Sequence, residues 1–237
     1  MAHLTCTREG TAETKKNMPH PLWSDEYWLP LMQLYLKKPV GVKPLYSRGL
    51  VSLSIELHIR PQYLHGCMLR LRSLDTPRLR RLWNTYAESP RRLSRAVSLI
   101  RKMKGFGDAD DFYRGVDMNE SFERDFRPVA ADSTFTPVKL IMVLDLYFRL
   151  VPATMVAATP EVAELAKLVG EKPDRLEAVM AVFRTFDPCM RHGSEDTIPT
   201  LLTAAETEAC AEVWRRYGME PENLASLAAQ LKDYWAD

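Results

Sequence analysis

Glycine is scarce in this sequence, with 10 residues in 237, and no segment alternates regularly between apolar and polar residues. Both absences argue against strands and favour helices, which the many Leu, Met and Ala residues also support. An uninterrupted apolar run is missing too. The most apolar stretch, Leu140 to Ala158, contains Asp145, Arg149 and Pro152, so we predict a buried core helix there and no membrane span.

Cysteines spaced as CxxC are also missing. The four cysteines lie far apart, so we expect neither a disulfide framework nor a zinc site, and we predict free buried thiols in a reducing compartment. The start of the chain is polar and has no apolar segment typical of a secretory signal, which favours a cytoplasmic protein. The four positions are Cys6, Cys67, Cys189 and Cys210.

Groupings that could support catalysis or metal binding are incomplete. A short acidic run lacks the spacing and the final glutamate of a calcium-binding loop. A Cys–His pair lacks a third group to orient it, and two histidines seven residues apart are separated by a predicted turn. We therefore predict a protein that is not an enzyme, with no catalytic residues, no metal and no cofactor. These groupings comprise Asp108, Asp110, Asp111, Cys189, His192, His58 and His65.

An internal repeat is the main organising signal. Residues 31–75 align with residues 143–187 at a shift of 112, with eight identities, and a W-x2-Y-x3-P-x2-L pattern recurs at a shift of 131. The change of shift places about nineteen extra residues near 190–202 in the second copy. The identities pair Leu34/Leu146, Tyr35/Tyr147, Leu53/Leu165, Pro61/Pro173, Leu64/Leu176, Met68/Met180, Arg72/Arg184, Asp75/Asp187, Thr76/Thr207, Trp83/Trp214, Tyr86/Tyr217, Pro90/Pro221 and Leu93/Leu224.

The repeat predicts an all-α fold made of two tandem helical modules that arose by internal duplication. In the first module, Ser24, Thr76 and Ser89 are expected to cap helices. We expect helices near residues 24–38, 50–58, 61–72, 76–87 and 90–104, the last with an apolar stripe that ends at Met103. The predicted organisation is a flexible tail (1–22), a basic module (23–104), an acidic connector (105–135) and an acidic module (136–237).

Each module contains the pattern of a helix-turn-helix corner. Such a corner needs a small residue in its first helix, a tight turn four residues later and an apolar residue on the second helix. Residues 53–68, LSIELHIRPQYLHGCM, resemble the helix-turn-helix of AraC-type regulators, which implies DNA binding by the second helix. His58 stands where that family has a turn glycine, and Arg60 where it has a capping serine. The corner positions are Ser54, His58 and Leu64, repeated as Ala166, Gly170 and Leu176.

Charge divides the chain unequally. Residues 37–104 carry sixteen Lys or Arg and three acidic residues, a net charge of +13, whereas residues 105–237 carry a net charge of −11. A basic segment of this kind suggests a polyanionic partner such as double-stranded DNA. In the second module Glu171, Asp174 and Glu177 would repel phosphate. That module is expected to mediate self-association, to bind a protein partner or to cover the basic face.

We predict that polar residues at the start of the second corner helix contact base edges, while later arginines hold the DNA backbone. The predicted nucleic-acid-binding residues are Arg60, Gln62, His65, Arg70, Arg72, Arg78, Arg80, Arg81, Arg91, Arg92 and Arg95, with Leu69 beside them.

Two interpretations of function remain open. The first is a DNA-binding transcriptional regulator that uses the basic module. The second is a non-enzymatic protein–protein adaptor whose corners serve only for packing, with a solvated basic face that meets an acidic partner or the acidic half of the same chain. The repeated aromatic residues could stack on bases, but their presence in both modules favours core packing. They are Trp83, Tyr86, Trp214 and Tyr217.

Overall fold

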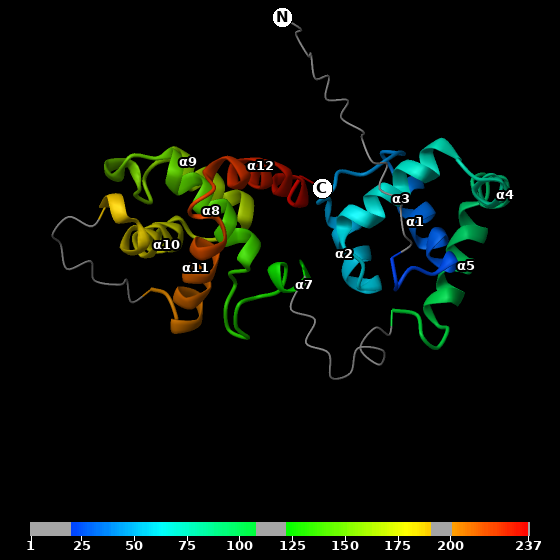
Figure 1. Cartoon of the computed structure of the whole chain (residues 1–237), viewed down its shortest axis with the longest axis horizontal. Helices are drawn as coiled ribbons and strands as arrows, with labels where there is room; N and C mark the ends of the chain where they lie inside the picture. The colour runs from blue at the N-terminus through cyan, green and yellow to red at the C-terminus, as the bar shows by residue number, and fades with distance from the viewer. Residues whose placement is uncertain (1–19, 108–121, 191–200, 237) are drawn as a thin grey trace, which may run out of the picture.

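The computed structural model describes residues 20–107, 122–190 and 201–236. Within these ranges the chain forms helices and no strand, which confirms the predicted all-helical class. Two groups of helices lie side by side along the long axis of the molecule, with α7 between them and the end of α12 pointing toward the first group (Figure 1). Each group has its own apolar core.

The first group is built around α1. Apolar residues of α1, α2, α3 and α5 meet in one core, which buries Leu31, Leu50, Leu64 and Val97. The α4 helix contributes Leu79 to this core, and its other residues are at least partly exposed. The elements are η1 (Asp25–Tyr27), α1 (Trp28–Leu36), α2 (Arg48–Leu57), α3 (Pro61–Ser73), α4 (Pro77–Tyr86) and α5 (Pro90–Arg101).

The helix predicted for residues 24–38 is shorter than expected and begins with a 3-10 turn. Ser24 makes no capping bond to the backbone, because its hydroxyl donates to the carboxylate of Glu26 instead. The helix ends at Leu36, and Pro39 disfavours helical backbone at the residue before it. The prediction of a single helix over this range was therefore wrong at both ends.

Of the other two residues predicted to cap helices in the first module, one makes a capping bond and one does not. Thr76 accepts a hydrogen bond from the N–H of Leu79 at 3.3 Å, as expected for a capping residue. Ser89 precedes Pro90 but its side chain makes no capping bond. Met103 was also assigned wrongly, since it is 57% exposed: α5 ends at Arg101, so Met103 does not continue the apolar stripe of the helix.

The second group surrounds α8, the most buried helix of the chain. Residues 140–147 of α8 are all buried, which confirms the predicted core helix, although the helix ends at Arg149. No helix among the described residues is long and apolar enough to cross a membrane. The elements are α7 (Phe122–Asp125), α8 (Pro137–Arg149), η2 (Pro152–Thr154), α9 (Pro160–Val169), α10 (Pro173–Phe186), η3 (Pro188–Met190), α11 (Ala204–Tyr217), α12 (Pro221–Leu231) and η4 (Lys232–Tyr234).

Helices of the two groups begin at closely matched intervals. The α2 and α3 helices begin 112 residues before α9 and α10, and α5 begins 131 residues before α12. The α4 and α11 helices end 131 residues apart, but α11 begins four residues earlier than that interval predicts. Thr207 consequently lies inside α11, and Thr203 is the capping residue. The predicted pairing of Thr76 with Thr207 is therefore not a pairing of caps.

The repeated aromatic residues pack against the cores. Trp83 contacts the ring of Tyr35 with 5.8 Å between centroids, and Trp214 contacts Tyr147 at 6.0 Å. Tyr86 and Tyr217 also pack against their respective cores. Core packing, rather than base stacking, is thus the role that the geometry supports.

The cysteines agree with the prediction in part. Cys67 and Cys210 are free and buried, and burial raises the pKa of these thiols to about 11 and about 12. Cys189 is free but exposed, so the prediction of burial was wrong for it, because η3 lies outside the core. Cys6 lies outside the described residues.

Candidate nucleic-acid interface

Both predicted helix-turn-helix corners are present as turns with matching geometry. His58 and Gly170 each adopt a left-handed backbone, with φ of 53° and 71°. After each turn an N–H bonds back to the small residue of the preceding helix: Ile59 to the carbonyl of Ser54 at 3.0 Å, and Glu171 to that of Ala166 at 2.9 Å. Leu64 and Leu176 are fully buried behind the turns. The corner is therefore a real local structure in both groups.

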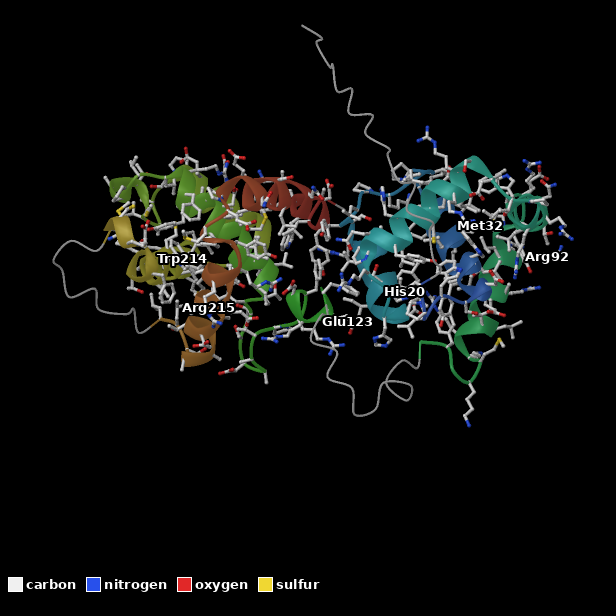
Figure 2. All side chains as sticks on the ribbon, in the orientation of Figure 1. His20, Met32, Arg92, Glu123, Trp214 and Arg215 are labelled. Atoms are coloured by element: carbon white, nitrogen blue, oxygen red, sulfur yellow. The ribbon has the colours of Figure 1, made fainter. Side chains whose placement is uncertain are left out.

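The tip of the first corner, which we define as His58 and residues 60–63, is held by the other half of the chain. His58 Nδ1 lies 2.7 Å from Oε1 of Glu123, a residue of α7 that Figure 2 shows beside the first helical group. Gln62 donates to the hydroxyl of Tyr46 at 2.9 Å, and the ring of Tyr46 packs against Phe126. Gln62, which we predicted to contact bases, and the turn residue His58 thus already have protein partners.

A second contact strengthens this attachment. The guanidinium of Arg48, the first residue of α2, lies 5.5 Å from the ring centre of Tyr234 in η4. Tyr234 also packs on Phe126, with 5.2 Å between ring centroids. The predicted acidic connector and the C-terminal end of the chain therefore meet the basic module at α2 and at the tip, and these contacts do not involve the arginines of α4 and α5.

The other predicted residues of α3 do not form one open surface. Arg60 caps the helix beside His20, whose pKa is lowered by burial and by the positive charge of Arg60. His65 is only partly exposed. Arg70 donates to Asp75 at 2.8 Å and lies over the ring of Trp28, so it points toward α1. Arg70 therefore packs toward α1 and does not lie on the exposed side of α3, where we predicted it from the sequence.

Residues at the start of the described chain also touch α3. The N–H of His20 donates to the hydroxyl of Tyr63 at 3.2 Å, and Trp23 packs against Tyr63 with 5.6 Å between ring centroids. Leu22 lies against the same core. The predicted flexible tail, residues 1–22, therefore extends too far by three residues, and the rest of it lies outside the described part of the chain.

Several arginines on α4 and α5 have exposed side chains that could bind a ligand. Arg81, Arg91 and Arg95 are exposed, and their guanidinium groups have no hydrogen-bond or ion-pair partner among the described residues. The same is true of Arg72 on α3. Arg92 lies over the ring of Tyr86 and stands at the outer end of the molecule (Figure 2). Arg78 and Arg80 are less available, because Arg78 pairs with Asp25 and Arg80 donates to a backbone carbonyl.

Three of these arginines surround a hollow of about 590 Å³ at the start of α5, which we call the arginine hollow. Its lining includes Arg91, Arg92 and Arg95 with Glu88 as the single acidic residue. The first turn of a helix presents unpaired N–H groups and a partial positive charge, which together attract anions. The hollow therefore combines two independent sources of anion affinity.

The position of these arginines conflicts with helix stability. Like α1, α2, α3 and α8, neither α4 nor α5 has an acidic residue in its first turn, but α5 carries two arginines there, Arg91 and Arg92. Positive side chains at a helix start cost a few tenths of a kcal/mol each, and Arg91 and Arg95 also repel one another at a spacing of four. Residues that destabilise the helix they occupy point to a ligand. Since Pro77 and Pro90 mark both helix starts, this signal was present in the sequence but missed.

The acidic side chains of the second corner are mostly bonded within the second helical group. Glu171, expected to face and repel phosphate, has a side chain only 4% exposed, 2.6 Å from Lys139 Nζ and 3.5 Å from Arg175. Glu177 accepts a hydrogen bond from the N–H of Ala157. Two of the three acidic residues therefore point inward, and Asp174 is exposed as predicted. The sequence could not reveal this, because Lys139 comes from a different helix.

The described residues contain no group of three metal-binding side chains. Asp108, Asp110, Asp111 and His192 lie outside the described residues, so the predictions made for them remain predictions.

The geometry defines a helical protein with two helix-turn-helix-like corners and an arginine-rich outer end. No protein-family model, curated protein or solved structure matches the chain.

Proposed function

We propose that this chain is a nucleic-acid-binding protein whose N-terminal module contacts the phosphate backbone through the arginine hollow and the exposed arginines nearby. The observation that carries the proposal is the placement of Arg91 and Arg92 in the first turn of α5, with Arg95 one turn later, so that three arginines surround an anion-attracting helix end. Arginine suits this role because its planar guanidinium can donate two hydrogen bonds to one phosphate.

Reading of base sequence by α3, as in a transcriptional regulator, is the second part of the proposal. Gln62 is bonded to Tyr46 of the same module and His58 to Glu123 of α7, so base contacts require Gln62 to leave Tyr46 and α7 to leave the tip. Phosphate contacts would then bring the chain to DNA, and base contacts would follow when the two halves separate. The resemblance to AraC-type regulators covers the corner alone, and base reading by α3 is supported only to that extent.

We also propose that the two helical groups arose by duplication. The matched helix starts, the shared left-handed turns and the repeated Pro at the first position of α3/α10 and α5/α12 support this. In this view the second copy has lost the basic surface and serves to control the first.

A protein–protein adaptor remains a second candidate. It is favoured by the second corner, which acts as a packing element, and by apolar side chains exposed on the basic module. Leu69 is 45% exposed, Leu99 67% and Met103 57%. An acidic protein partner could satisfy both the arginines and these apolar residues.

Salt titration separates the candidates. We expect the purified chain to bind a random-sequence duplex pool, with log affinity falling linearly as log salt rises. Several phosphate contacts predict a slope of about −3 or steeper. Sequencing of the bound fraction tests base reading, since a regulator enriches a motif. Binding that is absent at low salt, or insensitive to salt, would reject the nucleic-acid proposal and favour the adaptor.

A further inference from the structure

A second concave surface lies on the basic module and shares Pro90 with the arginine hollow. It is a groove of about 710 Å³ bounded by α1, α2 and α5, and its apolar lining includes Leu34, Leu53 and Leu93. Pockets of a few hundred to a thousand cubic ångströms with mostly apolar walls are typical sites for small organic molecules. The size and lining therefore fit one such molecule better than a metal or an inorganic ion.

The polar groups of the groove favour an anion. Glu56 and Arg101 form a two-point ion pair at 2.6 and 2.9 Å and so largely neutralise one another. Lys37 is exposed and, among the described residues, its ammonium group has no partner. The starts of α2 and α5 line the groove, but so do the ends of α1, α2 and α5, so the partial charges of the helix ends largely offset one another. Lys37 is then the one uncompensated charge among the described lining residues. The residual charge is thus positive.

Gly49 helps to keep the groove open. A Cβ atom at this position would come within 2.8 Å of Cδ1 of Leu34, so a larger residue would displace part of the apolar lining. The residue 112 positions later is Glu161, which would place a carboxylate in the corresponding space. The glycine is therefore a specific feature of the first module.

From these observations we propose that the groove binds a small amphipathic organic anion, with its apolar body on the leucine lining and its acidic group near Lys37. This site does not depend on nucleic-acid binding, because Arg91 and Arg95 lie outside the groove lining. A ligand bound here would contact the same helix that carries the arginine hollow.

The test uses 1-anilinonaphthalene-8-sulfonate as the anionic probe and neutral N-phenyl-1-naphthylamine as its uncharged counterpart. The full chain should bind the sulfonate saturably at one site and about tenfold more tightly than the neutral probe. Ser94→Trp, which fills the groove from α5, should weaken binding at least tenfold. Ser98→Trp, one turn later on α5 and outside the lining, is the matched control and should leave it unchanged.

Further variants keep the test decisive. Ser52→Trp fills the groove from α2 and replaces Ser94→Trp if that variant does not fold, and Lys37→Gln should weaken the sulfonate but not the neutral probe. Arg91→Gln/Arg95→Gln should not affect either probe. Equal binding by Ser94→Trp and Ser98→Trp, or no preference for the anion, would overturn the proposal. It would also be overturned if sedimentation showed a dimer that Ser94→Trp dissociates, because the groove would then hold a second copy of the chain.

Discussion

Replacing Arg91 and Arg95 with glutamine is expected to weaken binding to duplex DNA by about 100-fold at moderate salt. Each arginine is exposed and has no partner among the described residues, so its guanidinium is available to phosphate. A hydrogen bond to a charged group contributes about 1.5 kcal/mol, and two such bonds account for a factor of this size. The slope of log affinity against log salt should become shallower by about two. Fluorescence anisotropy with a labelled duplex measures both quantities.

The same double variant should not lose stability, and this distinguishes a binding role from a structural one. Removing Arg91 relieves its conflict with the helix dipole, and removing both charges relieves the repulsion between Arg91 and Arg95 at a spacing of four. The free energy of unfolding should rise by a few tenths of a kcal/mol. Lys167→Gln/Lys172→Gln is the charge-matched control on the second module, since both lysines are exposed. Equal loss of binding in the control would show that only net charge matters.

Replacing Glu206 with alanine is expected to lower the free energy of unfolding by about 3 kcal/mol, since it breaks a buried charged network. Glu206 is 1% exposed and accepts hydrogen bonds from Ser133 at 2.6 Å, Arg175 at 2.5 Å and the N–H of Thr203 at 3.0 Å. The substitution would remove the capping box of α11 and leave the guanidinium of Arg175 without this carboxylate. Urea denaturation followed by circular dichroism measures the loss.

Glu208→Ala provides the control on the same helix. Glu208 also pairs with an arginine, Arg215 at 3.1 Å, but its side chain is 76% exposed, so its loss should cost well under 1 kcal/mol. Comparable losses for the two variants would contradict the assignment of Glu206 as the buried anchor.

The effect of Glu206 should also depend on pH. Burial opposes ionisation, but the hydrogen bonds from Ser133, Thr203 and Arg175 outweigh it and lower the pKa of Glu206 in the folded chain. A carboxyl group with a lowered pKa stabilises the fold fully above its unfolded pKa, about 4.3, and loses this contribution as pH falls through the folded value. The gap between the wild type and Glu206→Ala should therefore narrow in acid. A gap that widened below pH 4 would be incompatible with this network.

Local features of the fold could be predicted from the sequence because their causes are local. Proline at the first position marked the starts of α3, α4 and α5, and the apolar stretch from Leu140 predicted the core helix α8. The corner turns were predictable even with His58 in place of glycine, because the flanking small and apolar residues constrain the turn. Local sequence was not enough to predict caps at Ser24 and Ser89. The hydroxyl of Ser24 donates to Glu26 instead of capping the helix, and the side chain of Ser89 makes no capping bond.

The candidate site was predicted less well because its surroundings come from distant parts of the chain. Glu123 contacts His58 although the two lie 65 positions apart in the sequence, and the ring of Tyr234, near the end of the chain, packs against Arg48. No local pattern in α3 reveals that its tip is covered. The arginines of α5 were chosen as candidates from charge alone, and they remain a prediction. Their place at a helix start, marked in the sequence by Pro90, was not used.

Hydrogen–deuterium exchange of the full chain with and without duplex DNA tests the central claim most directly. The account predicts slower exchange in α4 and α5, over residues 77–101, with no change in α11 and α12. Protection at residues 58–66 should appear only with a duplex that carries an enriched motif, because base contacts need the tip to be released. Protection confined to the second module, or unchanged exchange over residues 77–101 in a saturated complex, would contradict the account.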